Sequence, residues 1–305
     1  MTRPYRIVIW GAGRMYYAVV NTILSIVEKG QAEVLGIMAD SLPQNGVFDG
    51  FHILPKEALC SLEFDYLLLC LKGNPKDAIQ SIVETYGVPR EMIIRSCVMQ
   101  EPHFDLERYI RLRESNVTIV SDLCWGGFMY RRLDLRCMSP FRNLFIHNDD
   151  YLRLLGDLRE YCGKGLVHVG FKTDPETGVY PVMRLGDVEL RFNHAKTPEE
   201  AASQWHQRID RINWDNLFIM MHTEDREHEH AFNELEGYEK MICFVPYETS
   251  EPHSFRLIQQ PSEPFHGMVN LTAYSAAVAD PFDPVKLLLG EPDFAHYKLE
   301  ENCHA

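Results

Sequence analysis

The residues best suited to chemistry in this sequence are a thiol, imidazoles and carboxylates that follow apolar segments. Asp122 and Cys124 follow the segment 116–120, and His194 ends the segment 188–194. Because ligands of open α/β sheets bind beyond the carboxyl ends of the strands, we expect these groups to meet there. Such a site suits Cys–His nucleophilic acyl transfer or general-base catalysis by histidine. The predicted catalytic residues are Asp122, Cys124, Asp187 and His194.

Each candidate also has a purely structural interpretation. Cys124 lies between Leu123 and Trp125, and free cysteine is among the most buried residue types. Asp187 occurs in a Gly-Asp turn, where aspartate is common for backbone reasons alone. His194 follows a strand-like segment and is also suited to capping it.

A second set of side chains is suited to holding a substrate. Arginines at 208 and 211 suit a phosphate, although a solvated helix face is the more common role of such residues. Tryptophans at 125 and 214 suit stacking on a sugar ring, although core packing is the more common role. The predicted substrate-binding residues are Ser121, Trp125, Arg208, Arg211 and Trp214.

Histidines and acids also gather between His222 and His230 in a spacing that zinc sites use. Glu224–Glu229 is, however, a dense run of charge, which is typical of a solvated face. The sequence therefore predicts that this run binds no metal.

Near the N-terminus, a Gly-x-Gly turn follows an apolar strand and precedes a helix. Gly11 permits the tight turn, Gly13 lets the backbone approach a pyrophosphate, and the helix beginning at Arg14 attracts the anion. Asp40, at the end of the next strand, suits a ribose hydroxyl. Tyr16 replaces the third glycine of the dinucleotide-binding pattern, so the motif leaves nucleotide-sugar and NAD(P) both open as ligands.

These residues require alternating strands and helices to position them. In the first part of the chain the sequence predicts strands at 5–10, 33–39, 51–54, 64–71 and 92–96, with helices at 14–29, 55–59 and 74–86. In the second part it predicts strands at 116–120, 180–185, 188–194, 217–221 and 240–245, with helices at 104–114, 148–161 and from Thr197 onward. The predicted fold is two α/β domains with mainly parallel sheets, at 1–105 and 106–305, the first Rossmann-like.

Composition narrows the class of protein. The 305 residues include 44 acidic and 30 basic side chains, a net charge of −14, which disfavours nucleic acid and anionic lipid as partners. No apolar run reaches the ~18 residues that span a bilayer. The 8 cysteines form no Cys-x-x-Cys pair, which is typical of reduced thiols. We expect a cytoplasmic protein with a small nucleotide or sugar ligand, and a homo-oligomer is compatible with the sequence.

The second half resembles a known bacterial family through an ordered set of motifs. These are Ser121-Asp122-Leu-Cys124-Trp125-Gly126-Gly127, Ser139-Pro140-Phe141, Tyr180-Pro181, Leu185-Gly186-Asp187-Val-Glu189 and Arg211-Ile-Asn213-Trp214-Asp215. Across residues 112–290 they resemble the family catalogued as domain of unknown function 1919, whose members are often labelled exopolysaccharide-biosynthesis proteins. The usual family form has Asn where this chain has Asp122. The first half resembles the N-terminal domains of bacterial sugar-modifying enzymes, including certain sugar O-acyltransferases, whose turn faces a nucleotide-sugar.

The resemblance implies a role in surface-glycan assembly but supplies no catalytic residue with a known role. The leading hypothesis is a transferase-like enzyme that uses a nucleotide or nucleotide-sugar. The alternatives are an NAD(P)-dependent oxidoreductase acting on a sugar and a non-enzymatic ligand-binding partner of a glycan-assembly complex.

Overall fold

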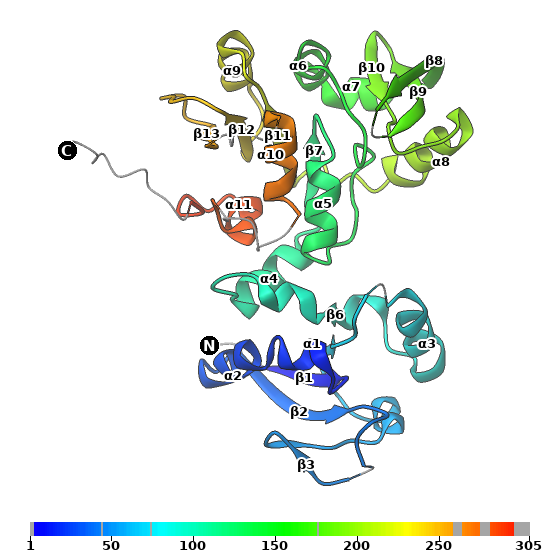
Figure 1. Ribbon diagram of the computed structural model, residues 1–305, viewed down its shortest axis with the longest axis vertical. Helices are drawn as coiled ribbons and strands as arrows, with labels where there is room; N and C mark the ends of the chain where they lie inside the picture. The colour runs from blue at the N-terminus through cyan, green and yellow to red at the C-terminus, as the bar shows by residue number, and fades with distance from the viewer. Residues whose placement is uncertain are drawn as a thin grey trace, which may run out of the picture. The chain divides into compact units, whose positions relative to one another are not determined.

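The chain forms two compact α/β units. The computed structural model describes residues 3–43, 45–73, 75–175, 177–258, 264–274 and 281–295. The units are Met1–Arg111 and Leu112–Ala305, with the boundary inside helix α4 (Leu106–Glu114). Each unit contains a parallel sheet flanked by helices, so the predicted α/β class with mainly parallel sheets is confirmed (Figure 1).

The first unit is built on a parallel sheet with the strand order β2-β1-β5-β6. Its strands lie on segments that the sequence predicts: β1 (Tyr5–Trp10), β2 (Ala32–Met38), β5 (Tyr66–Leu69) and β6 (Ile93–Arg95). The expected strand at 51–54 is reduced to a small hairpin of β3 (Val47–Phe48) and β4 (Phe51–His52), and Ile53 bridges Ile37 in parallel. Because β2 and β5 lie on opposite sides of β1, the chain reverses direction across the sheet at β1, which is where doubly wound sheets bind ligands.

The prediction of a single helix at 14–29 is wrong. Two helices, α1 (Arg14–Tyr17) and α2 (Val20–Glu28), replace it, because the backbone leaves helical geometry at Val19. Tyr16, at the third glycine position of the motif, is fully buried with its ring centroid 5.6 Å from that of Phe48. The other helical segments of the unit are η1 (Lys56–Cys60), α3 (Lys76–Tyr86), η2 (Arg90–Met92) and η3 (Ser96–Gln100). Residue 74, where the predicted third helix begins, lies outside the described residues.

The second unit contains a parallel sheet with the order β13-β12-β11-β7. Its strands are β7 (Thr118–Ser121), β11 (Leu217–His222), β12 (Met241–Val245) and β13 (Ser254–Arg256). Successive residues of β11 enter opposite cores: Phe218 and Met220 pack on one side, Ile219 and Met221 on the other. A parallel strand buried on both faces reads as a continuous apolar run, and this is why the sequence predicts β11 and β12 correctly.

A separate antiparallel sheet, β10-β9-β8, lies in the same unit. Its strands are β8 (Leu166–Asp174), β9 (Gly178–Leu185) and β10 (Val188–Arg191). The sequence does not predict β8. The alternating apolar residues of this edge strand, Val167, Val169 and Phe171, lie on its exposed face, and a bulge interrupts the strand between His168 and Gly170.

Helices cover both faces of the parallel sheet of the second unit (Figure 1). The helix expected at 148–161 is interrupted at Asp157. The helices are α5 (Trp125–Arg132), α6 (Asn148–Gly156), α7 (Leu158–Cys162), α8 (Pro198–Ile209), α9 (Arg226–Asn233), α10 (Phe265–Thr272) and α11 (Pro284–Leu289).

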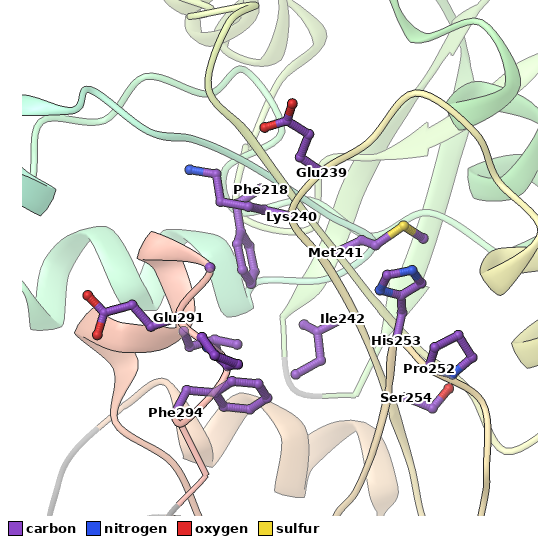
Figure 2. A pocket seen from close by; sticks show the side chains of 13 residues that line it. Phe218, Glu239, Lys240, Met241, Ile242, Pro252, His253, Ser254, Glu291 and Phe294 are labelled. Atoms are coloured by element: carbon purple, nitrogen blue, oxygen red, sulfur yellow. The ribbon is translucent and has the colours of Figure 1, made fainter.

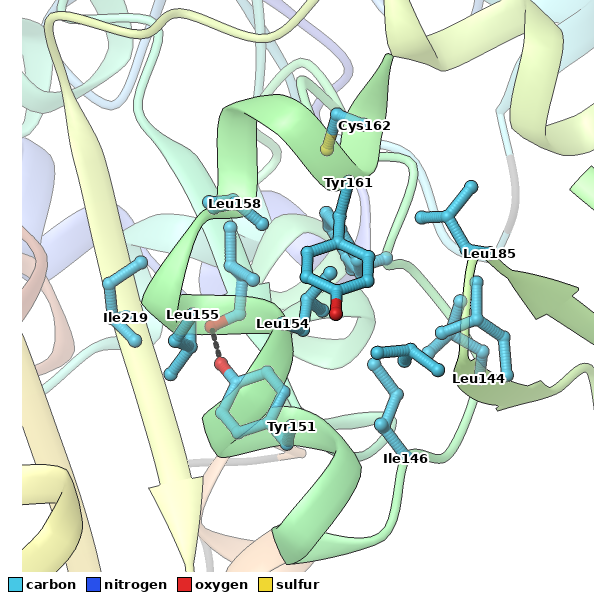
Figure 3. Close-up of a cluster of buried hydrophobic side chains, with 14 of the residues drawn as sticks. Leu144, Ile146, Tyr151, Leu154, Leu155, Leu158, Tyr161, Cys162, Leu185 and Ile219 are labelled. Atoms are coloured by element: carbon cyan, nitrogen blue, oxygen red, sulfur yellow. Dashed lines mark hydrogen bonds between the residues drawn. The ribbon is translucent and has the colours of Figure 1, made fainter. Parts of the chain in front are cut away.

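Tyr151 ties α6 to the sheet beneath it. Its ring is fully buried among leucines of α6 and α7 (Figure 3). Its hydroxyl lies 2.9 Å from the carbonyl oxygen of Val120 in β7 and 3.0 Å from that of Met220 in β11. The contact lies close to the carboxyl ends of both strands and holds them side by side, which fixes the backbone from which the candidate site is built.

Candidate functional site

The carboxyl ends of β7 and β11 bring a carboxylate and an imidazole together. Asp122 follows the last residue of β7, and His222 is the last residue of β11. The strands pair in parallel, with Ser121 opposite Met220, so the next residues of each strand emerge at the same edge. One carboxylate oxygen of Asp122, Oδ2, lies 2.7 Å from Nδ1 of His222 and accepts the backbone N–H of His222 at 3.1 Å.

Burial makes this pair electrostatically strong. The side chain of Asp122 is fully buried, and that of His222 is 13% exposed. Burial alone would lower the pKa of His222, but the charge and hydrogen bond of Asp122, joined by the charge of Glu224, raise it above 6.5. The second carboxylate oxygen of Asp122, Oδ1, is buried without a hydrogen-bond partner. Such a charged acceptor is costly unless a donor reaches it.

Further contacts fix the orientation of the imidazole. The side-chain amide of Asn148, the first residue of α6, donates to the backbone carbonyl of His222 at 3.0 Å. The ring of Phe265 lies with its centroid 6.3 Å from that of the imidazole. Since Nδ1 faces Asp122, Nε2 is the nitrogen left for a substrate. Within the described ranges, no hydrogen bond is made by Nε2.

A second pair joins the predicted thiol and imidazole. The sulfur of Cys124 lies 3.1 Å from Nε2 of His194, so the expected Cys–His contact exists. Burial raises the pKa of the Cys124 thiol to about 11, which a hydrogen bond with Asn193 only partly offsets. Burial also lowers the pKa of His194. The pair is therefore a neutral thiol beside a neutral imidazole, not a thiolate–imidazolium pair.

We expect Cys124 to resist alkylation at neutral pH. A thiol with a pKa of about 11 is ionised on the order of one part in 10⁴ at pH 7, and the thiolate is the reactive form. Iodoacetamide labelling followed by site-resolved mass spectrometry should show slow reaction at Cys124, accelerating as pH rises towards 11. The exposed Cys60 is the internal control and should react first. Rapid labelling of Cys124 at pH 7 would contradict this expectation and would show that the thiol is ionised enough to act as a nucleophile.

The segment between β7 and α5 is packed without spare volume. Ser121 donates to the carbonyl of Leu123 at 2.8 Å and accepts the backbone N–H of Gly126 at 3.2 Å. A side chain on Gly126 would place its Cβ 2.8 Å from the Ser121 hydroxyl, and one on Gly127 would lie 2.3 Å from the Asn143 side chain. The Ser121–Gly127 motif thus builds the turn that carries Asp122 and Cys124, and Ser121 itself is bonded internally.

Comparison with known proteins assigns this motif-bearing region. The family model described as a domain of unknown function, DUF1919, matches residues 95–288. The chain belongs to the DUF1919 family. A second model, described as C2185-like, N-terminal, matches residues 3–94.

Individual relatives are also similar to this chain. An uncharacterised protein of Haemophilus influenzae is 34% identical over 134 residues, which span 43% of this chain and 63% of that protein. Among solved structures, D-galactose-1-dehydrogenase of Rhizobium etli matches with a TM-score of 0.24 and 11% identity over 81% of this chain and 99% of that one. That likeness is too low to carry an argument about fold or activity.

Within the DUF1919 region, Asp187 lies in a turn of the antiparallel sheet. Gly186 and Asp187 connect β9 to β10, and Gly186 adopts a φ of +66°. The carboxylate accepts the hydroxyl of Tyr161 at 2.6 Å, which lowers the pKa of Asp187, and the side chain is 63% exposed. These contacts explain Asp187 as the closing residue of a tight hairpin.

The two tryptophans named from the sequence are held by protein contacts. Trp125 is fully buried, stacks on Phe218 with ring centroids 6.0 Å apart, and donates its Nε1–H to Thr272. A sugar cannot reach this ring without opening the core. Trp214 is partly buried, and the guanidinium of Arg159 lies 4.5 Å from its ring centroid.

The arginines named from the sequence lie at the far end of α8. Thr197 caps the helix start by accepting the N–H of Glu200, near His194 in the sequence, whereas Arg208 and Arg211 lie at its other end. Two residues beyond Arg211, the N–H of Asn213 donates to Thr118 at the first residue of β7. These arginines are therefore placed towards the amino edge of the sheet, away from Asp122.

In the first unit, the backbone conformation explains why residue 11 is a glycine. Its φ is +107°, and a Cβ there would lie 2.7 Å from the carbonyl oxygen of Cys70. Gly13 precedes α1, and a Cβ there would meet nothing within 4 Å. Arg14 is exposed, and the exposed carboxylate of Asp40 is ion-paired with Lys56. The helix after the turn, α1, has only four residues, so it lacks the dipole of the longer helix that the sequence predicts from Arg14.

The histidines of the charged run are separated by their partners. His228 contacts Asp149 and His230 contacts Glu251, at 3.0 and 3.1 Å, while His222 is paired with Asp122. Asp225 caps α9 by accepting the N–H of Glu227. In the part of the chain that the structure describes, no three metal-ligating side chains gather. In the same part, no helix has the length and apolar character needed to span a membrane.

A pocket of about 170 Å³ opens at the other edge of the DUF1919 sheet, beside the first residues of β12. Figure 2 shows Phe218, Ile242 and Phe294 around it, with Lys240 and Glu291 nearby. Burial lowers the pKa of Lys240, whose ammonium binds the side chain of Asn216. The sequence does not predict this pocket, because its lining comes from separate segments spread between Phe218 and Phe294.

His222 is not among the catalytic residues that the sequence predicts, although it is the direct partner of Asp122. The usable signal was its position as the first polar residue after the apolar run 217–221. In a parallel sheet that position is at the ligand-binding edge.

Proposed function

We propose that this chain is a group-transfer enzyme of bacterial surface-glycan biosynthesis, in which His222 activates a hydroxyl group of the acceptor. The observation that carries the proposal is the buried Asp122–His222 pair at the carboxyl edge of a parallel sheet. The DUF1919 resemblance to exopolysaccharide-associated proteins supplies the biological context.

The chemistry requires one proton transfer. Nε2 of neutral His222 takes the proton of the acceptor hydroxyl while the oxygen attacks the electrophilic centre of the donor, whose leaving group departs with the bonding electrons. The imidazolium that forms is stabilised by the Asp122 carboxylate at Nδ1, as in other carboxylate–histidine pairs. The raised pKa of His222 favours this protonated form, and activity should therefore rise with pH as the imidazole becomes neutral.

A nucleotide-binding site within the first unit is part of the same proposal. Gly11–Gly13 follows β1, between the ends of β2 and β5, which is the position where doubly wound sheets take nucleotides. A nucleotide-sugar is the donor class that suits a glycan transferase. The ion pair between Asp40 and Lys56 must open for Asp40 to accept a ribose hydroxyl.

A ligand panel tests the donor assignment. Thermal unfolding is measured with nucleotide-sugars, NAD, NADP, acetyl-CoA and S-adenosylmethionine. A ligand at ~100 times its Kd adds about 2.7 kcal/mol to the unit that binds it, which raises its midpoint by several degrees. A shift with nucleotide-sugars alone supports the proposal. A shift with NAD or NADP alone indicates an oxidoreductase. If no ligand shifts the midpoint, the assignment of a nucleotide site to the first unit is wrong.

Two glycine variants sharpen the same experiment. Gly13→Ala should leave the unliganded midpoint unchanged, because its Cβ meets nothing within 4 Å, but should abolish the ligand shift by blocking the approach of a pyrophosphate. Gly11→Ala should lower the unliganded midpoint, because its Cβ would lie 2.7 Å from a backbone oxygen. An undiminished shift in Gly13→Ala would place the ligand elsewhere.

A variant of the proposed base tests the acceptor chemistry. With the donor identified by the panel, His222→Gln should reduce transfer or donor hydrolysis about 10²–10⁴-fold while the donor-induced midpoint shift remains. His228→Gln, which loses only a surface contact with Asp149, is the matched control. Equal activity in the two variants would refute the assignment of His222.

A further inference from the structure

Three arginines of the second unit lie on two segments that pack together, and none of them has an acidic partner among the described residues. They are Arg142, in the loop after α5, and Arg208 and Arg211, at the end of α8. Phe141 joins the two segments, because its ring packs edge-on against Trp205 with centroids 5.3 Å apart. Arg142 follows Phe141 in the sequence, and Arg208 lies one helical turn after Trp205. The packing of Phe141 on Trp205 therefore brings the segment of Arg142 towards that of Arg208.

The positive charges of Arg142 and Arg211 act on Arg208. Burial lowers the pKa of Arg208, and the positive charges of Arg142 and Arg211 lower it further. The sulfur of Cys137 acts in the opposite direction, and no carboxylate contributes. Within the described ranges, none of the three guanidinium groups forms an ion pair.

Arg142 adds a second, independent observation. Its stem lies against the helix backbone at Gly127, where a Cβ would come within 3.0 Å of Arg142 Cγ. Its Nε is inaccessible to solvent and has no hydrogen-bond partner. Arg142 is therefore not held by an acceptor of the protein at this nitrogen, although a buried charged donor without an acceptor costs free energy.

The overall charge makes the cluster more significant. The protein carries 44 acidic side chains against 30 basic ones, yet these three arginines have no counter-ion among the described residues. Planar guanidinium groups hold phosphate oxygens through paired hydrogen bonds, which a single ammonium cannot do.

We propose that Arg142, Arg208 and Arg211 form a binding site for the phosphate group of a soluble phosphorylated ligand, separate from the Asp122–His222 site. The site is placed towards the amino edge of the parallel sheet, because α8 ends two residues before Arg211 and Asn213 then bonds to the start of β7. It binds phosphate by charge and hydrogen bonding, and it requires neither His222 nor the first unit.

Pyrophosphate and inorganic phosphate are the probes, titrated into the full chain at constant ionic strength set with sodium chloride. Binding is followed by calorimetry and by the thermal midpoint. We expect saturable binding of pyrophosphate that weakens at least tenfold in Arg208→Met and in Arg142→Met, which keep the apolar stem and remove the charge. Arg184→Met, at an exposed position on β9, is the control and should bind as the wild type does.

Arg211→Met keeps the test valid if a buried arginine is needed for folding, because Arg211 is exposed. Its unliganded midpoint should equal or exceed that of the wild type, since repulsion is relieved, while its pyrophosphate affinity falls. His222→Gln should retain wild-type pyrophosphate affinity, which separates this site from the proposed function.

Binding to anionic phospholipid vesicles is measured as a further experiment. Binding to vesicles without binding of pyrophosphate would overturn the proposal. Absence of binding, or equal affinity in the arginine variants and Arg184→Met, would also overturn it.

Discussion

Replacing Asp122 with alanine is expected to destabilise the second unit by about 3–5 kcal/mol, the cost of breaking a buried ion pair by removing one partner. The carboxylate is fully buried and satisfies both the backbone N–H and Nδ1 of His222. In Asp122→Ala both donors lose their acceptor. Denaturant unfolding monitored by tryptophan fluorescence measures the loss, and a change below about 1 kcal/mol would show that the pair is not an energetic centre.

Asp122→Asn is the matched control, and its effect should depend on pH. Asparagine keeps the shape and one acceptor oxygen but removes the charge that raises the pKa of His222, so burial should bring that pKa below 6.5. Because the folded-state pKa is raised in the wild type, the charge contributes fully below the unfolded value of about 6.5 and is lost as pH rises through the folded value. The stability gap between wild type and Asp122→Asn, measured from pH 5.5 to 9, should therefore narrow with increasing pH. A gap that is constant across this range would contradict the assignment.

Replacing Trp125 with alanine is expected to cost about 3–5 kcal/mol, as for other large-to-small changes at buried aromatic positions. The indole is fully buried, stacks on Phe218, packs against Phe244 and donates to Thr272. The free energy of unfolding and the midpoint of the second unit measure the effect.

Two comparisons show whether Trp125 is a core residue or a ligand platform. Trp125→Phe keeps most of the ring contacts and should recover more than half of the loss. Trp214→Ala removes a partly buried ring covered by Arg159 and should cost clearly less than Trp125→Ala. If Trp125→Ala were stable and only ligand binding suffered, the core assignment would be wrong.

The sequence could predict the parallel strands and the general place of the site because both depend on local pattern. Runs such as Leu217–Met221 are apolar on both faces, and the polar residue after such a run lies at the ligand-binding edge. This reasoning placed Asp122 and Cys124 on the correct turn. His194 meets Cys124 for a different reason than expected, since it follows β10 of the antiparallel sheet and not a strand of the parallel one.

Features that depend on distant partners could not be predicted in this way. Nothing local marks Val19 as a break in an otherwise amphipathic helix. The break at Asp157 does have a local signal, because Gly156-Asp157 is followed three residues later by Glu160, whose N–H Asp157 caps. The pairing of Asp122 with His222 joins residues 100 positions apart, and the segments that carry Arg142 and Arg208 meet through the packing of Phe141 on Trp205. Single-residue propensities contain no information about such contacts.

The absence of side chains at Gly126 and Gly127 has a consequence for the timescale of the site. Helix α5 lies so close to β7 at Gly126, and to the side chains of Arg142 and Asn143 at Gly127, that a methyl group at either glycine would overlap a neighbour. The turn between them therefore has no room to open alone, and its amide hydrogens should exchange with solvent only when the whole second unit unfolds. Asp122 would then be held in place before any ligand arrives, and substrate binding at this edge should show no slow ordering phase.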